Sequence, residues 1–196
     1  MELFYNKGVK LCAWIAAVFL FVPQSLLAVN MRARNREVKK MEIKSSAFSM
    51  NQPIPKKYTG EGEDVSPDLE FLNVPEKAKS LALIMDDPDA PPGTWIHWVI
   101  YNLPKDTRHL PENFPKKEAL KDGTKQGPCW GVDSFERVGY YGPMPPPGKP
   151  HHYFFKLFAL DKTLDIKPSH ATKNELLKAM KGHILASAEL VGVYQR

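Results

Sequence analysis

The chain has 196 residues, of which 43% are hydrophobic and 25% are charged, and its formal net charge is +5. The excess positive charge lies near the N-terminus, because residues 1–30 carry +1 and residues 31–40 carry +4, which leaves residues 41–196 neutral. A neutral folded part argues against nucleic acid as a partner, since nucleic-acid-binding domains present a basic surface.

The first 28 residues are predicted to be a secretory signal peptide. Lys7 and Lys10 precede the apolar run LCAWIAAVFLFV, which leads through a short polar break to Ala28. This order is typical of an exported, periplasmic or secreted chain, and the run is shorter than the roughly 20 residues of a membrane-spanning helix. An uncleaved membrane anchor is the alternative. Cleavage would leave Cys129 as the only cysteine, so no internal disulfide is expected.

Residues 29–40 contain the segment MRARNREVKK and are predicted to be a basic linker, with attraction to anionic lipid as the alternative. Residues 41–196 have a length that suits a single domain with a proper core. We therefore expect one folded domain from residue 41 to the end.

Within this domain, short apolar runs alternate with Pro, Gly and Asp or Asn breaks, which is a strand-rich pattern. The expected strands, in chain order, are EIKSSAF, LEFLNV, SLALIM, TWIHWVIYNL and HYFFKLFAL, and HILASAELVGVY near the C-terminus also has strand-like composition. One helix is indicated by the capping box of Thr172 and Glu175, an apolar face and Gly182. The pattern predicts a mainly-β (α+β) antiparallel sandwich with a few short peripheral helices.

The segment MDDPDAPPGTWIHW, residues 85–98, gathers acidic, aromatic and histidine residues at the end of an expected strand. Alternate residues of a strand point the same way, so Asp87 and Asp89 are expected to face one cavity. Trp95, His97 and Val99 would share one face of the next strand, with Trp95 as a wall of the site.

A second segment, GYYGPMPPPGKPHHY at residues 139–153, offers further candidates. Gly142 can expose backbone N–H groups, the proline run forms a stiff rim, and His151 and Tyr153 alternate on one strand face, while His152 points away. The structural alternatives are that Asp-Pro-Asp is a turn whose carboxylates cap backbone N–H groups, that the histidines pack in the core, and that the proline run is a plain loop.

The motifs DDPDAP with WIHW, followed by GYYGPMPPPGKPHHY, resemble those of the phosphatidylethanolamine-binding protein family, also called Raf kinase inhibitor-like, and especially its bacterial branch. The resemblance extends over roughly residues 47–194 and implies a Greek-key β-sandwich with a conserved anion pocket. It assigns to the phosphoryl pocket Asp87 and Asp89 of the Asp-Pro-Asp motif, His97, and the pair His151 and Tyr153. His152, Asp133 and Glu136 depart from the family pattern, which puts the rim in doubt and not the pocket.

Carboxylates repel a phosphate, so the aspartates are expected to orient the imidazoles and favour their charged form, while the histidines donate N–H groups to the anion. Tyr153 and the backbone beside Gly142 would complete the cradle. The expected function is that of a secreted protein that binds a phosphate-bearing small molecule or a phospholipid headgroup, with no catalysis, cofactor or metal.

Two other functions stay open. The PMPPPG rim suits an inhibitor that binds a protease or kinase, so a protein partner is an alternative, and a homodimer is also compatible with the sequence. Two Asp and two His side chains are also plausible zinc ligands for a phosphohydrolase, although no clustered ligand motif is present.

Overall fold

The computed structural model describes residues 39–132, 135 and 137–196. The predicted signal peptide and nearly all of the predicted basic linker therefore lie outside the described residues, as do Asp133 and Glu136. Lys39–Arg196 form one compact unit. None of the described helices has the length and apolar character that a membrane span requires.

The regular elements of the described residues are mostly strands, with one α-helix and two short 3-10 helices. The long elements are β4 (Ser80–Asp87), β5 (Trp95–Pro104), β10 (His151–Leu160), β11 (Ile184–Tyr194) and α2 (Lys173–Met180). The short elements are β1 (Glu42–Lys44), β2 (Gln52–Pro53), η1 (Lys56–Tyr58), β3 (Leu69–Leu72), β6 (His109–Leu110), β7 (Lys125–Gln126), β8 (Pro128–Cys129), β9 (Arg137–Val138) and η2 (Pro168–His170).

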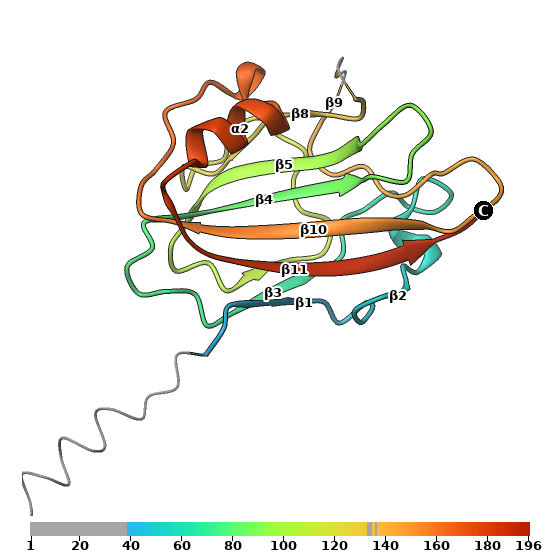
Figure 1. The fold of residues 1–196 in the computed structure, drawn as a ribbon, viewed down its shortest axis with the longest axis horizontal. Helices are drawn as coiled ribbons and strands as arrows, with labels where there is room; N and C mark the ends of the chain where they lie inside the picture. Colours follow the sequence, from blue (N-terminus) through green and yellow to red (C-terminus); the bar gives the residue numbers. More distant parts are fainter. Residues whose placement is uncertain (1–38, 133–134, 136) are drawn as a thin grey trace, which may run out of the picture. The chain divides into compact units, whose positions relative to one another are not determined.

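The strands form a six-stranded sheet in the order β2-β11-β10-β4-β5-β7 and a three-stranded sheet in the order β1-β3-β6, and β8 pairs with β9 (Figure 1). The pairings are antiparallel except for the short parallel pair of β2 and β11. This confirms the predicted mainly-β (α+β) class.

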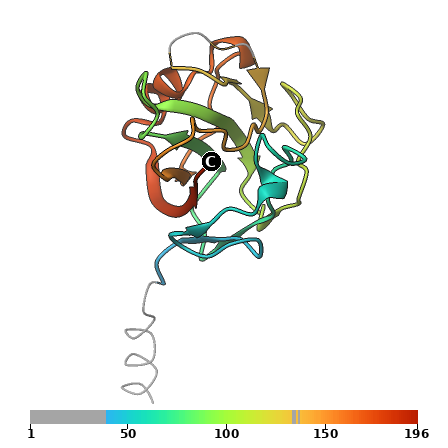
Figure 2. The ribbon, with the colours of Figure 1, turned by 90° about the vertical axis from the view of Figure 1, so that its right-hand side faces the viewer.

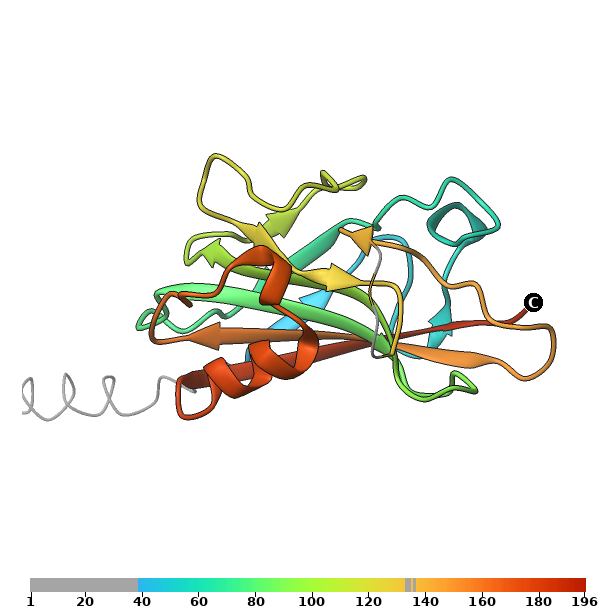
Figure 3. The ribbon, with the colours of Figure 1, turned by 90° about the horizontal axis from the view of Figure 1, so that it is seen from above.

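Two apolar clusters cover the two faces of the large sheet. One cluster lies between the sheets, where Ile43 and Phe71 of the small sheet meet Leu83, Trp98 and Phe155 of the large one. On the other face, Leu176 and Met180 of α2 pack on Ile84, Val99 and Tyr101. Figure 3 shows α2 lying along that face.

The alternating patterns predicted β4, β5 and β10 well, because each of these strands has one face on each cluster. The predicted helix is α2, and Thr172 is its N-cap, because its side chain accepts from the N–H of Glu175 at 3.3 Å. The second half of the predicted capping box does not form, since the N–H of Thr172 donates to the carbonyl of His170 and the Glu175 carboxylate contacts Lys178. The segment expected as a strand from residue 42 to 48 ends early, at Lys44.

The two sequence motifs meet at one end of the large sheet. The turn after β4 lies on the right of Figure 1, together with the loop before β10 and the C-terminus, and Figure 2 looks onto this end. Because β4 is antiparallel to both β5 and β10, the end of β4 lies beside the starts of its two neighbours. The topology thus brings residues 85–98 and 139–153 together.

Candidate functional site

A cavity of about 170 Å³ opens at this end of the sheet. Its polar groups are Asp87, His97, His151 and Tyr153. The remaining lining residues are apolar or aromatic: Ala90, Pro91, Pro92, Trp95, Trp130, Met144, Pro145 and Pro146. The cavity therefore combines a few converging polar groups with an apolar collar, which is the usual composition of a small-molecule site.

Asp87 and His151 form a buried pair between β4 and β10. Their side chains are 4% and 8% exposed, and the Nδ1 atom of His151 lies 2.8 Å from Oδ2 of Asp87. The other carboxylate oxygen accepts the N–H of Asp89 at 2.8 Å. With both oxygens engaged inside the protein, the carboxylate orients the imidazole, as the sequence predicted, and the Nε2 edge of the ring is left for the cavity.

His97 reaches the cavity because of a β-bulge. Met85 pairs with Trp98 and Asp86 pairs with Ile96, so His97 is the extra residue of β5. The bulge overturns the expectation that His97 shares a face with Val99, since Val99 packs in the cluster under α2. The ring lies edge-on to Tyr153, with the two centroids 5.2 Å apart.

The protonation of His97 follows from its contacts. Its Nδ1 atom lies 2.6 Å from the carbonyl oxygen of Tyr141, and since a carbonyl only accepts, Nδ1 carries a proton and donates it. Burial lowers the pKa of His97, although the Tyr141 hydrogen bond and the charge of Asp87 oppose this effect. The expectation that a carboxylate contacts this imidazole and favours its charged form does not hold for His97, because its Nδ1 partner is a carbonyl and burial favours the neutral ring, in which Nε2 is an acceptor.

The hydroxyl of Tyr153 is buried without a hydrogen-bond partner among the described residues. Burial, together with the nearby Asp87 carboxylate, raises the pKa of Tyr153, but the hydroxyl makes no hydrogen bond of acceptable geometry to that carboxylate. The group stays protonated and is available as a donor. A buried hydroxyl without a partner costs free energy, so it marks a place where a ligand or a water molecule is expected.

The structure brings together five of the seven predicted site residues, namely Asp87, Trp95, His97, His151 and Tyr153. It places the other two, Asp89 and Gly142, outside the cavity lining. In each case, a specific hydrogen bond accounts for the difference.

Asp89 does not face the cavity beside Asp87. The strand ends at Asp87, whose carboxylate caps the N–H of Asp89 in the turn, and this directs Asp89 toward the start of β10. There it accepts from the backbone N–H of His152 at 2.9 Å and contacts the exposed ring of the same residue at 2.8 Å. Asp89 therefore fastens the end of the proline-rich loop to the turn.

Gly142 contributes close packing and not a free N–H group. Its N–H donates to Oδ1 of Asp64 at 2.6 Å, so this donor is already engaged. A Cβ atom at this position would overlap the carbonyl oxygen of Tyr58. Only glycine lets the segment lie this close to the loop of Tyr58 and Asp64.

Sequence reasoning missed Trp130, which forms a cavity wall and adopts a left-handed backbone with φ of 69°. Its ring lies edge-on to Trp95 and His97, at centroid distances of 5.8 and 5.5 Å, and the guanidinium of Arg137 lies 4.7 Å from its centre. Nothing periodic marks this tryptophan, because β8 and β9 around it have two residues each. Its position next to Gly131 was the only signal.

Chemically, the cavity offers one hydroxyl donor, two imidazole Nε2 atoms that accept when neutral and donate when protonated, and an aromatic collar. Over residues 39–132, 135 and 137–196, no three His, Cys, Asp or Glu side chains gather as metal ligands would.

The model of the family named phosphatidylethanolamine-binding protein matches residues 44–195. The chain belongs to the phosphatidylethanolamine-binding protein family. This confirms the resemblance seen in the two motifs, which supply the polar groups of the cavity.

Relatives in this family span the same domain. A UPF0098 protein of Methanothermobacter thermautotrophicus is 49% identical over 156 residues, covering 80% of this chain and 99% of the relative. A UPF0098 protein of Aquifex aeolicus is 49% identical over 158 residues, covering 80% and 89%.

Two solved family structures are similar to this one. A crystal structure described as a candidate phosphatidylethanolamine-binding protein homologue from Chlamydia trachomatis has a TM-score of 0.71 and 42% identity, over 80% of this chain and 98% of that chain. YbcL of E. coli, described as a new member of the mammalian family, has a TM-score of 0.69 and 29% identity, over 81% and 99%.

Proposed function

We propose that the protein is a binding protein whose cavity takes up a phosphoryl group or a phospholipid headgroup and performs no catalysis. The observation that carries the proposal is the buried hydroxyl of Tyr153, which has no hydrogen-bond partner in the described part of the chain and points to a ligand acceptor beside two imidazoles whose Nδ1 atoms are already engaged. Membership of the phosphatidylethanolamine-binding protein family supports the same class of ligand.

The contacts define how an anion would bind. In the neutral rings, the two Nε2 atoms are acceptors, as are the oxygens of a phosphate, so binding requires a proton on each ring or on the phosphate itself. A ring protonated on Nε2 would donate to a phosphoryl oxygen, a protonated phosphoryl group would donate to a neutral Nε2, and in both cases Tyr153 would donate to the ligand. The apolar collar would surround the rest of the ligand.

Export is part of this proposal. It rests on the charge, apolar run and small residue of the first 28 residues, which are typical of a signal peptide. A phospholipid headgroup or a soluble phosphate ester outside the cytoplasm would then be the ligand.

The test is calorimetric titration of the full chain with phosphoethanolamine at pH 6, with and without a chelator. Two or three charge-assisted hydrogen bonds, less the cost of immobilising a small ligand, predict a dissociation constant on the order of micromolar to millimolar. Affinity should fall toward pH 8, after correction for the titration of the ligand, because His97 must take up a proton before its Nε2 can donate to an anion.

The matched variants are His97→Asn and His183→Asn. Asparagine can still donate to the Tyr141 carbonyl but lacks Nε2, so the first variant should abolish binding, whereas the second alters an exposed His–Asp pair and should leave binding intact. Parallel titrations with inorganic phosphate and with phosphatidylethanolamine vesicles separate a free phosphate from a headgroup. Absence of binding, or binding that the chelator removes, would contradict the proposal.

A further inference from the structure

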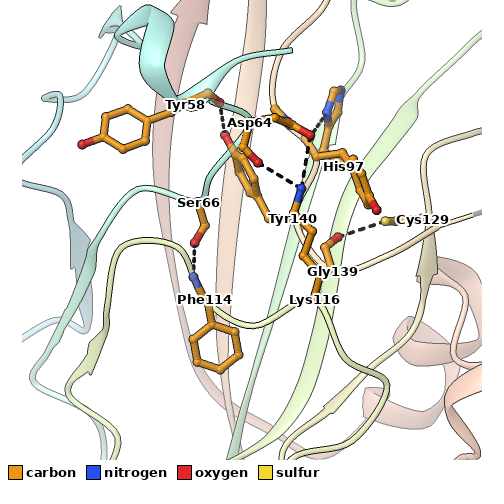
Figure 4. Close-up of polar contacts among 11 residues, drawn as sticks. Tyr58, Asp64, Ser66, His97, Phe114, Lys116, Cys129, Gly139 and Tyr140 are labelled. Carbon is orange, nitrogen blue, oxygen red and sulfur yellow. Dashed lines mark hydrogen bonds and ion pairs between the residues drawn. The ribbon is translucent and has the colours of Figure 1, made fainter. Parts of the chain in front are cut away.

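One peptide group connects His97 to a second carboxylate. The carbonyl of Tyr141 accepts the Nδ1 proton of His97 at 2.6 Å, and the N–H of Gly142 donates to Oδ1 of Asp64 at 2.6 Å. These two groups belong to the same peptide bond, which joins Tyr141 to Gly142. Asp64 and His97 are therefore linked through one amide (Figure 4).

A carboxylate at one end of an amide strengthens the acceptor at the other end. Hydrogen bonds in a chain polarise one another, so an N–H that donates to Asp64 makes the Tyr141 carbonyl a better acceptor for His97. The link also fixes the carbonyl in space, because the peptide is planar and its N–H is held. The backbone N–H of Tyr141 donates to the carbonyl of His97 at 3.1 Å and completes the clamp.

Each imidazole of the cavity is thus connected to a carboxylate on its Nδ1 side. His151 contacts Asp87 directly at 2.8 Å, and His97 reaches Asp64 through the peptide. In each case Nδ1 faces the protein, and the Nε2 edge is left for the cavity that both residues line.

We propose that Asp64 is a positioning residue that acts on His97 through the Tyr141–Gly142 peptide, keeping the ring proton on Nδ1 and Nε2 toward the ligand. The proposal deepens the proposed function, and its meaning for ligand binding rests on that function. No feature of the sequence around Asp64 singled this residue out.

Lys116 tunes the same carboxylate. Its Nζ atom lies 3.2 Å from Oδ2 of Asp64 and 2.9 Å from the Asp64 carbonyl oxygen, and 3.9 Å from the centre of the Tyr141 ring. The two side chains are 29% and 30% exposed, so their attraction is only partly screened by solvent. Lys116 reduces the negative charge that the peptide link transmits to His97.

Other charged groups also lie near His97 and affect its pKa. Asp86 and Asp87 on β4 add negative charge, which favours the protonated ring, and Asp64 acts in the same direction. The remaining titratable or charged groups on neighbouring elements are His151 and Tyr153 on β10 and Arg137 on β9.

The test follows the ring nitrogens of His97 by NMR in the full chain, labelled with ¹⁵N-histidine and assigned by the signal that His97→Asn removes. Wild-type protein should show the neutral tautomer with its proton on Nδ1. Asp64→Asn keeps an acceptor for the Gly142 N–H but removes the charge, so the His97 titration midpoint should move to lower pH. Lys116→Met leaves the carboxylate unneutralised, so the midpoint should move to higher pH.

The opposite signs distinguish an electrostatic action of the Asp64 carboxylate on His97 from a merely structural role. Asp68→Asn is the matched control, because the Asp68 carboxylate contacts Ser45 and Ser46 and has no hydrogen bond to His97, Tyr141 or Gly142 among the described residues. Shifts of the same sign in both variants, or a shift in Asp64→Asn no larger than in Asp68→Asn, would overturn the proposal. If Asp64→Asn does not fold, the shift of the His97 titration midpoint in Lys116→Met is the deciding result.

Ligand binding gives a second readout. The affinity for inorganic phosphate at pH 6 should fall about fivefold in Asp64→Asn, the size expected for a residue that acts through another. If wild-type protein does not bind phosphate, the proposed function fails, while the ring titration still decides whether Asp64 acts on His97.

Discussion

The Tyr153 hydroxyl separates ligand binding from plain core packing at the scale of a single residue. It is buried and has no partner among the described residues, so the protein itself provides no hydrogen bond that offsets its cost of desolvation. A ligand oxygen that accepts from this hydroxyl would recover that cost. The same group would then stabilise the complex and not the free chain.

Tyr153→Phe is therefore expected to leave the free energy of unfolding unchanged or to raise it by about 1 kcal/mol, while phosphoethanolamine affinity falls about fivefold or more. Tyr101→Phe is the contrasting variant, because the Tyr101 hydroxyl donates to the carbonyl of Ile166 at 2.8 Å. It should cost about 1 kcal/mol of stability and leave affinity unchanged. Chemical denaturation and calorimetry check both, and a destabilised Tyr153→Phe with normal affinity would refute the ligand role.

At the scale of the elements, a buried carboxylate ties α2 to the large sheet. Asp86 on β4 is fully buried, and its carboxylate contacts Lys156 of β10 at 2.8 Å and Lys173 of α2 at 2.5 Å. The next residue is Asp87, which lines the cavity, so these two ion pairs also fix the end of β4 beside the cavity. The two adjacent aspartates thus make polar contacts on opposite faces of the sheet: Asp86 contacts α2, and Asp87 contacts His151 at the cavity.

Lys156→Met with Lys173→Met should destabilise the protein by about 3–5 kcal/mol, because a buried charge is left without a partner. Adding Asp86→Leu to the two changes should restore most of the loss, since the whole polar cluster is then replaced by apolar groups. Urea denaturation of the double and triple variants measures the difference. A triple variant as unstable as the double variant would show that the charge is not the cause.

The long strands were predictable from the sequence, but the bulge in β5 was not. The period of two identified β4, β5 and β10, because their side chains alternate between two apolar clusters, and so placed His151 and Tyr153 correctly. The bulge at His97 was not predictable, because it arises from the pairing of β4 with β5 and leaves no mark in the composition of either strand.

The remaining misses lie in loops, where no period exists. Asp64 and Trp130 reach the site through contacts between segments far apart in the chain, such as the hydrogen bond from Gly142 to Asp64. Gly142 was visible in the sequence, but the reason why this position requires glycine was not, because the close approach to Tyr58 is a tertiary contact. Asp89 was misplaced for a similar reason, since the cap by Asp87 turns it toward His152.

At the scale of the whole molecule, His97 should make stability depend on pH. Burial lowers its pKa in the folded protein, whereas in the unfolded chain the pKa is about 6.5. The unfolded chain therefore binds more protons than the folded one below neutral pH, and the free energy of unfolding falls as pH drops from about 7 toward 5. The loss ends below the folded-state pKa, where both states are protonated.

His97→Asn should flatten this part of the pH profile, because asparagine can keep the donor to Tyr141 and does not titrate. The difference between the two profiles isolates the contribution of His97. Urea denaturation between pH 5 and pH 7.5, in buffers without phosphate, measures the two profiles. The wild-type protein should lose about 1.4 kcal/mol of unfolding free energy for each unit by which the folded-state pKa of His97 lies below the unfolded value. Adding phosphate should reverse the trend for wild-type protein alone, since a bound anion favours the protonated ring. Parallel profiles for the two proteins would mean that His97 does not exchange its proton on unfolding, and the proton-linked account of the cavity would fail with it.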